Sequence, residues 1–284
     1  MIGLLRAEWL RLRKRRDIWL VAMALVGLSV VGYVSGVSNA LNIGGPFPAD
    51  FPPEAIDQMR EQARQELLRY PFPTSIGTVI QNGQILVLAL LAYLAAAITG
   101  AEFAYGTIRT SLVAHADRRG FLIVRLGAMT AAAFLLVALL VVLGIVLPLA
   151  AALLGTSLPR VADPNIGGLA GLVGVMFLAT CFVIGLTTFW AVLIRNAAVA
   201  LVLTIAYTLI EGAVVGLIVR LAGEESLVRW LLPVADLQLL FDRAHGGPTG
   251  AAMPTLLAIS VGVAWVLAIW AASVWVLARS DIRE

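Results

Sequence analysis

The sequence predicts an all-α integral membrane protein, and three observations support this fold class. Of its 284 residues, 61% are hydrophobic and only 13% are charged, whereas a soluble domain has about 45–50% apolar and about 25% charged residues. The hydrophobic residues fall into six blocks, each close to the roughly 20 residues that a helix needs to cross a bilayer. Basic residues gather in alternate connections between these blocks. A water-soluble globular protein is therefore excluded.

We expect six transmembrane helices in a single domain that extends over residues 1–284. Only Arg195 and Asn196 separate the fourth block from the fifth, which predicts a tight hairpin there. For the second block, a start as early as Ser75 is an alternative. The expected spans are Ile18–Val37, Ile85–Ala101, Leu126–Leu154, Gly168–Ile194, Ala197–Val219 and Thr255–Leu277.

The basic residues predict which side of the membrane the termini occupy. An even number of spans places both termini on one side, and a cytoplasmic placement puts 13 Lys and Arg residues inside and seven outside. Cytoplasmic loops carry an excess of these residues, so we expect both termini to be cytoplasmic. A cleaved signal peptide is the alternative for the basic start, but its apolar core would exceed the usual length of about 7–15 residues.

An amphipathic helix is expected before the first span, within residues 1–17. Ile2, Leu5, Trp9 and Leu12 recur at spacings of three and four and therefore share one helix face. A basic helix with a tryptophan on its apolar face is typical of a helix that lies in the membrane interface. The alternative is a basic anchor that is helical but has no interfacial role.

Two polar segments are expected on the outer side. The first, 38–84, contains a predicted helix, Glu54–Tyr70, which either caps the membrane domain or is part of a solvated loop. The second, 220–254, contains two short apolar pieces, 230–233 and 237–241. Pieces of this length suit helices that dip into the membrane and return, although amphipathic loop helices would have the same pattern.

Several kinds of chemistry are excluded by residue counts and motifs. The single cysteine, Cys181, permits no intramolecular disulfide, and with only His115 and His245 present we expect no metal site. The single lysine, Lys14, follows Arg13 and not a glycine, so the chain has no phosphate-binding loop of the GxxxxGK[ST] type. Motifs of metalloproteases and serine hydrolases are also missing from the sequence. We therefore expect no enzyme activity and no cofactor in this chain.

The connection between the second and third spans, 102–125, contains the most informative pattern. Residues 107–114 can form a short helix, which basic residues and one glutamate flank. The pattern resembles that of the membrane subunits of ABC-2 type ATP-binding-cassette transporters, and so does the order of elements along the whole chain. Departures occur at His115, where proline is common, at Asp117, where serine is common, and at Arg125, where lysine is more usual. The matching residues are Glu102, Gly106, Thr107, Arg109, Arg118 and Arg125.

The resemblance implies a permease of a bacterial inner membrane that an ATPase drives. In that family a separate ATPase subunit, which binds ATP and Mg, contacts each permease, and two permeases pair. For this chain it implies an exporter subunit that is surrounded by lipid and has no nucleic acid as a partner. It pairs either with a second copy of itself, as a homodimer, or with a related permease. The helix within 102–125 would sit in a groove of the ATPase. The implied contacts are Glu102, Gly106, Thr107, Arg109, Arg118, Arg119 and Arg125.

Polar residues within the spans are candidates for a substrate route. Ionisable groups at membrane depth are functional candidates, and Glu211 is the one acid inside a predicted span. In the resembling family the second and fifth spans line the route, which adds Gln81, Asn82, Gln84 and Tyr93. The alternative for each of them is an interhelical hydrogen bond.

Glycine pairs four residues apart permit close helix packing. Such pairs occur at Gly32 and Gly36, at Gly167 and Gly171, and at Gly212 and Gly216.

A second class of function, an ion-coupled secondary transporter without an ATPase, stays open. The spans lack paired acids, and no broken-helix repeat relates the two halves of the chain, both of which count against it.

Overall fold

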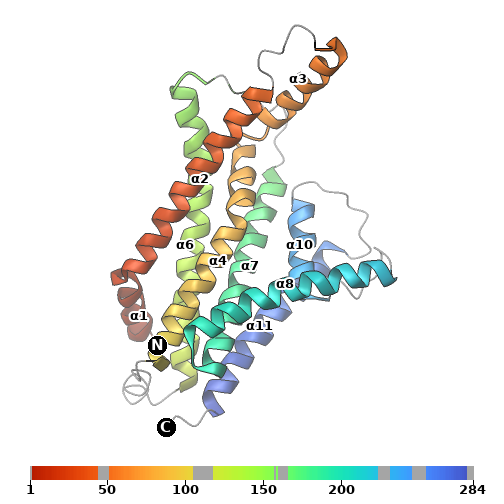
Figure 1. Cartoon of the computed structure of the whole chain (residues 1–284). Helices are drawn as coiled ribbons and strands as arrows, with labels where there is room; N and C mark the ends of the chain where they lie inside the picture. Colours follow the sequence, from red (N-terminus) through yellow and green to blue (C-terminus); the bar gives the residue numbers. More distant parts are fainter. Residues whose placement is uncertain are drawn as a thin grey trace.

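Every regular element in the described part of the chain is an α-helix. Figure 1 shows a bundle of long helices with both termini at the same end. The computed structural model describes residues 2–43, 51–104, 118–156, 158, 166–222, 231–244 and 254–279.

Six of the described helices are long and apolar enough to cross a membrane. Each of them contains most or all of one predicted span, so the prediction of six spans is confirmed and the protein is a multi-pass helical membrane protein. The helices are α2 (Arg16–Ile43), α4 (Thr74–Ala104), α6 (Arg118–Leu153), α7 (Ile166–Ile194), α8 (Ala197–Ala222) and α11 (Thr255–Arg279).

Some boundaries differ from the prediction at the end of the bundle away from the termini, where polar residues of the helices find partners. Helix α4 begins at Thr74, which confirms the earlier start of the second span. The Ser75 hydroxyl is buried there and donates a hydrogen bond to the carbonyl oxygen of Gly144 on α6, at 2.5 Å. Helix α2 continues to Ile43, so the connection between α2 and α4 is shorter than the predicted segment 38–84.

Among the described residues, three shorter helices lie outside the spans. Helix α1 (Ile2–Lys14) packs on α6. Helix α3 (Pro53–Leu67) confirms that a helix forms within the predicted range Glu54–Tyr70, although it ends three residues earlier. Helix α10 (Pro233–Ala244) lies within the predicted outer segment 220–254 and packs against α7, α8 and α11. The turn after α3 is tied to α2, because the Tyr33 hydroxyl donates to the Tyr70 carbonyl oxygen at 2.9 Å.

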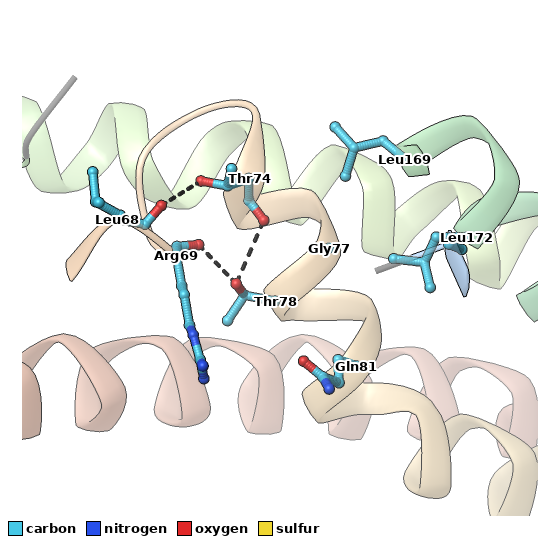
Figure 2. Close-up of a pocket in the computed structure, with 9 residues that line it drawn as sticks. Leu68, Arg69, Thr74, Gly77, Thr78, Gln81, Leu169 and Leu172 are labelled. Atoms are coloured by element: carbon cyan, nitrogen blue, oxygen red, sulfur yellow. Dashed lines mark hydrogen bonds between the residues drawn. The ribbon is translucent and has the colours of Figure 1, made fainter. Parts of the chain in front are cut away.

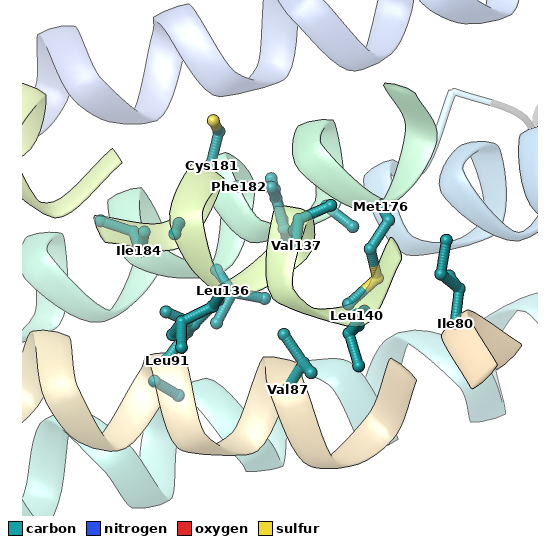
Figure 3. Packing of buried hydrophobic residues seen from close by; sticks show 14 of the residues in the cluster. Ile80, Val87, Leu91, Leu136, Val137, Leu140, Met176, Cys181, Phe182 and Ile184 are labelled. Carbon is teal, nitrogen blue, oxygen red and sulfur yellow. The ribbon is translucent and has the colours of Figure 1, made fainter. Parts of the chain in front are cut away.

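Helix α7 is the central helix of the bundle and packs against α4, α6, α8, α10 and α11. The core in Figure 3 comes from α4, α6 and α7, whose branched and aromatic side chains interdigitate. Met176 and Leu140 are completely buried there, and Cys181 is a buried free cysteine. Since lipid is as apolar as these side chains, close packing and not hydrophobic exclusion holds such helices together.

Candidate functional site

An exposed stripe runs along one side of α4. Gln81, Ile85, Ala89 and Tyr93 recur every four residues and are all exposed, Ile85 by 83% and Tyr93 by 44%. The rest of α4 packs against α6, α7, α8 and α2, and Figure 1 shows α4 passing between α2 and α8. We call these four residues the α4 stripe. Two of the predicted route residues, Gln81 and Tyr93, therefore lie on one uncovered face.

A cavity of about 370 Å³ adjoins the Gln81 end of the α4 stripe. It lies where the turn before α4 meets α7 and α10, at the end of the bundle away from the termini (Figure 1). Figure 2 shows two hydroxyls that are already used by the turn: Thr74 donates to the Leu68 carbonyl at 2.8 Å, and Thr78 donates to that of Arg69 at 2.7 Å. Gln81 adds an amide group to the same wall.

The other two route residues on α4 lie off this stripe. Asn82 faces α2, where it lines a small hollow of about 70 Å³ together with Ser29 and Tyr33. Gln84 is half-buried on a different side of the helix. The predicted route residues of α4 therefore do not all share one surface.

Glu211 caps a helix instead of facing the α4 stripe. Its side chain is buried, and its Oε1 accepts hydrogen bonds from the backbone N–H groups of Val234 at 2.6 Å and Ala235 at 3.2 Å. These two residues lie in the first turn of α10, whose first N–H groups have no partner within the helix. A carboxylate at this position satisfies them and interacts favourably with the positive end of the helix dipole. This cap joins α8 to α10 across the chain, and no pattern in the sequence predicted it.

A second buried acid, Asp236, was missed because only acids inside the predicted spans were considered, and Asp236 lies in the segment 220–254 between two of them. The residue is completely buried in the first turn of α10, and within the described residues neither of its carboxylate oxygens has a hydrogen-bond partner. Burial raises the pKa of Asp236 to about 7, although the nearby Arg243 lowers it. The carboxylate of Asp236 lies against α11, because a Cβ at Gly262 of that helix would be 3.2 Å from Asp236 Oδ2.

The predicted ATPase contacts are only partly within the described residues. Gly106, Thr107 and Arg109 lie outside them. Glu102 and Arg118 belong to α4 and α6, but their side chains are not among those described. Among the rest, Arg119 is exposed.

Arg125, the last of these predicted contacts, is buried and joins two helices. Its Nη2 donates to the carbonyl oxygen of Ile98 on α4 at 2.6 Å, and the guanidinium lies 5.6 Å from the centre of the Phe121 ring. Hydrogen bonds from charged donors are the stronger ones. The two helices that border residues 105–117 are therefore held together by this side chain.

The predicted glycine pairs have different surroundings. A Cβ at Gly36 would collide with the Tyr70 ring, so this glycine makes room for the turn after α3. At Gly212 and Gly216, by contrast, a Cβ would meet no atom within 4 Å. Close packing at this pair is therefore not found within the described part of the chain.

No protein-family model matches the chain, and the comparison with curated proteins finds no match either. Among the described residues, no group of three or more His, Cys, Asp and Glu side chains could hold a metal ion.

Proposed function

We propose that this chain is the permease subunit of an ABC-2 type ATP-driven exporter, with a separate ATPase subunit bound at residues 102–125. The observation that carries the proposal is the pattern from Glu102 to Arg125, which lies between the second and third spans. The six apolar helices and the excess of basic residues on the side of the termini are consistent with it. The ATPase would supply the ATP and Mg sites that this chain lacks.

The hydrogen bond from Arg125 to the Ile98 carbonyl oxygen supports a mechanical coupling between the ATPase and the membrane helices. The segment 105–117 connects the ends of α4 and α6, and Arg125 holds these ends together. A push by the ATPase on the segment would therefore move both helices as one unit. Since α4 carries the exposed stripe, this movement would reshape the surface that contains Gln81 and Tyr93.

We propose that a second copy of the chain covers the α4 stripe. Polar groups that face lipid are costly at membrane depth, so Gln81 and Tyr93 would gain from a partner or from a water-filled route. Two copies that face each other through this stripe would enclose a pathway between them. The cavity next to Gln81 would then lie at its outer end.

The test is co-purification of an ATPase with the tagged chain, expressed together with its neighbouring genes in mild detergent. Charge reversals Arg118→Glu and Glu102→Arg should release the ATPase or uncouple its hydrolysis from transport, because both residues flank the proposed docking helix. The matched control is Arg64→Glu, an exposed reversal on α3 at the other end of the bundle, which should change neither. Full ATPase binding and transport in both variants would refute the proposed contact.

The buried acids favour one alternative, an ion-coupled transporter that uses no ATPase. Both acids are buried where α8 meets α10. Glu211 of α8 accepts a hydrogen bond from the first turn of α10, and the same turn contains Asp236. Transport by the purified chain alone, driven by a proton gradient across a vesicle membrane and independent of ATP, would establish this alternative. Transport that needs both ATP and the co-purified subunit would exclude it.

A further inference from the structure

Two apolar cavities lie on either side of Trp9 in the N-terminal helix α1. One has a volume of about 830 Å³ and extends between α1, α6 and α7. The other, about 340 Å³, extends between α1, the start of α2 and α6. Both contain Trp9 and Leu135 in their walls, so the indole separates two adjoining spaces. We call them the Trp9 cavities; their volumes lie in the range of about 300–1,000 Å³ that is typical of ligand sites.

The walls of the Trp9 cavities are almost entirely hydrocarbon. In the larger cavity Phe134 and Phe177 stand edge to face, with ring centres 5.9 Å apart. Gly127 widens the same cavity, since a Cβ there would meet no atom within 4 Å. The smaller cavity is lined by Ile18 and Leu139, among other aliphatic residues. Such surfaces suit flexible alkyl chains.

Each cavity has one arginine in its wall, Arg6 in the larger and Arg13 in the smaller. Both arginines are exposed, and two turns of helix, about 10 Å, separate them. The one acid of α1, Glu8, is buried and pairs with Arg11 at 3.2 Å, so its charge is already balanced. The rims of the cavities are therefore positive, while their interiors are apolar.

We propose that the Trp9 cavities bind one anionic phospholipid of the leaflet on this side of the membrane. Its phosphate lies between Arg6 and Arg13, and its two acyl chains enter the cavities on either side of Trp9. Basic residues at a membrane surface attract anionic lipids, and guanidinium groups pair strongly with phosphate. The bound lipid fills the space between α1 and α6, and thereby holds α1 against the bundle. This site is independent of the proposed ATPase partner.

Quenching of tryptophan fluorescence by brominated lipids tests the site, because Trp9 borders both cavities. The full chain is reconstituted into phosphatidylcholine vesicles that contain increasing fractions of phosphatidylglycerol brominated on its acyl chains. We expect a saturable quenching component at low fractions, absent when the brominated lipid is phosphatidylcholine. Because Trp19 also lines the smaller cavity, Trp9→Phe should reduce this component, and Trp9→Phe combined with Trp19→Phe should remove it. Arg6→Gln combined with Arg13→Gln should raise the half-saturating fraction by about tenfold, the effect of losing charge-assisted contacts.

The matched control removes the same amount of charge from residues that do not line the cavities. Lys14 and Arg16 are both exposed, and Lys14→Gln combined with Arg16→Gln should shift the half-saturating fraction by less than about threefold. An equal shift in the two double variants would show general charge attraction and would overturn the proposal. Equal quenching by both brominated lipids would overturn it as well, because it would indicate an ordinary layer of surrounding lipid.

Discussion

Helices α7 and α8 are neighbours in sequence and similar in composition, but α7 is mostly buried in the bundle whereas α8 is mostly exposed. Their most apolar windows have mean hydropathies of 2.4 and 2.1, yet 61% of the residues in the α7 window are buried against 11% in α8. Leu209 of α8 is 70% exposed, whereas Met176 of α7 is completely buried. Hydropathy therefore predicts which segments enter the membrane but not which of them form the centre of the bundle.

Small and polar residues distinguish the two helices. Helix α7 contributes Gly185, against which the Trp270 ring of α11 packs closely. On α8 the buried residues Ala200, Thr204 and Glu211 form a narrow stripe, with a hydrogen bond of 3.1 Å from Thr204 to Thr187 of α7. Small residues and hydrogen bonds are the main means by which membrane helices associate. Helix α8 is therefore held along one line, and its other faces are open to lipid or to a partner.

The largest expected effect comes from adding volume to a glycine on each helix. A Cβ at Gly185 would lie 2.5 Å from Trp270 Cδ1, so Gly185→Val must displace the indole and break its hydrogen bond to the Cys181 carbonyl, now 3.2 Å. We expect a loss of about 4 kcal/mol in the free energy of unfolding. The matched change on α8, Gly216→Val, should cost less than about 0.5 kcal/mol, because the site is open.

Thermal unfolding of the purified variants in detergent measures both changes. Equal destabilisation by the two substitutions would show that α8 is packed as tightly as α7, and the contrast between the two helices would be wrong.

A smaller effect, which depends on pH, is expected at α10, the helix that packs against both α7 and α8. Burial raises the pKa of Asp236 from 3.8 to about 7, with Arg243 of the same helix opposing the shift. Between these two values the folded protein holds a proton that the unfolded chain has released. Stability should therefore fall as the pH rises from about 4 to about 7, by at most about 1.4 kcal/mol per pH unit, and stay low above that.

Asp236→Asn should abolish this dependence and make the protein more stable than the wild type at pH 8, because the amide carries no charge. The control is Asp57→Asn, at an exposed position on α3, which should keep the wild-type profile. Unfolding temperatures at several pH values between 5 and 8 supply the comparison. A wild-type profile that is flat over this range would contradict the prediction.

The sequence predicted the helices well and their contacts poorly, for a physical reason. The length and hydropathy of a span depend on its own residues, so all six spans could be found. A helix face is buried by residues far away in the chain, as the contact of Glu211 with α10 illustrates. Asp236 lies between the two short apolar pieces of the segment 220–254, and the sequence did not show that α10 would bury it completely. For Arg125, the position at the start of a span was predicted, but its bond to Ile98 was not.

The smallest expected effect distinguishes a structural role of Glu211 from a role in transport. Glu211→Leu removes the acceptor of two N–H groups of α10 and should loosen that helix by about 1–2 kcal/mol. Glu211→Gln keeps an acceptor oxygen and should have little effect on α10. The loosening is measured by thiol labelling of Leu239→Cys, which replaces a buried residue of α10, in a Cys181→Ser background. The control is Leu209→Ala, at a residue of α8 that is 70% exposed.

The two substitutions at Glu211 also separate the two hypotheses about its function. If the carboxylate only caps α10, transport should be impaired only where α10 is labelled faster, so that Glu211→Gln is tolerated and Glu211→Leu is not. If it binds a substrate or a proton, Gln should impair transport while α10 stays protected from labelling, because an amide cannot carry the charge. The second result would show that the cap at Val234 and Ala235 is also a working part of the transport route, and that α8 owes its position to function as well as to packing.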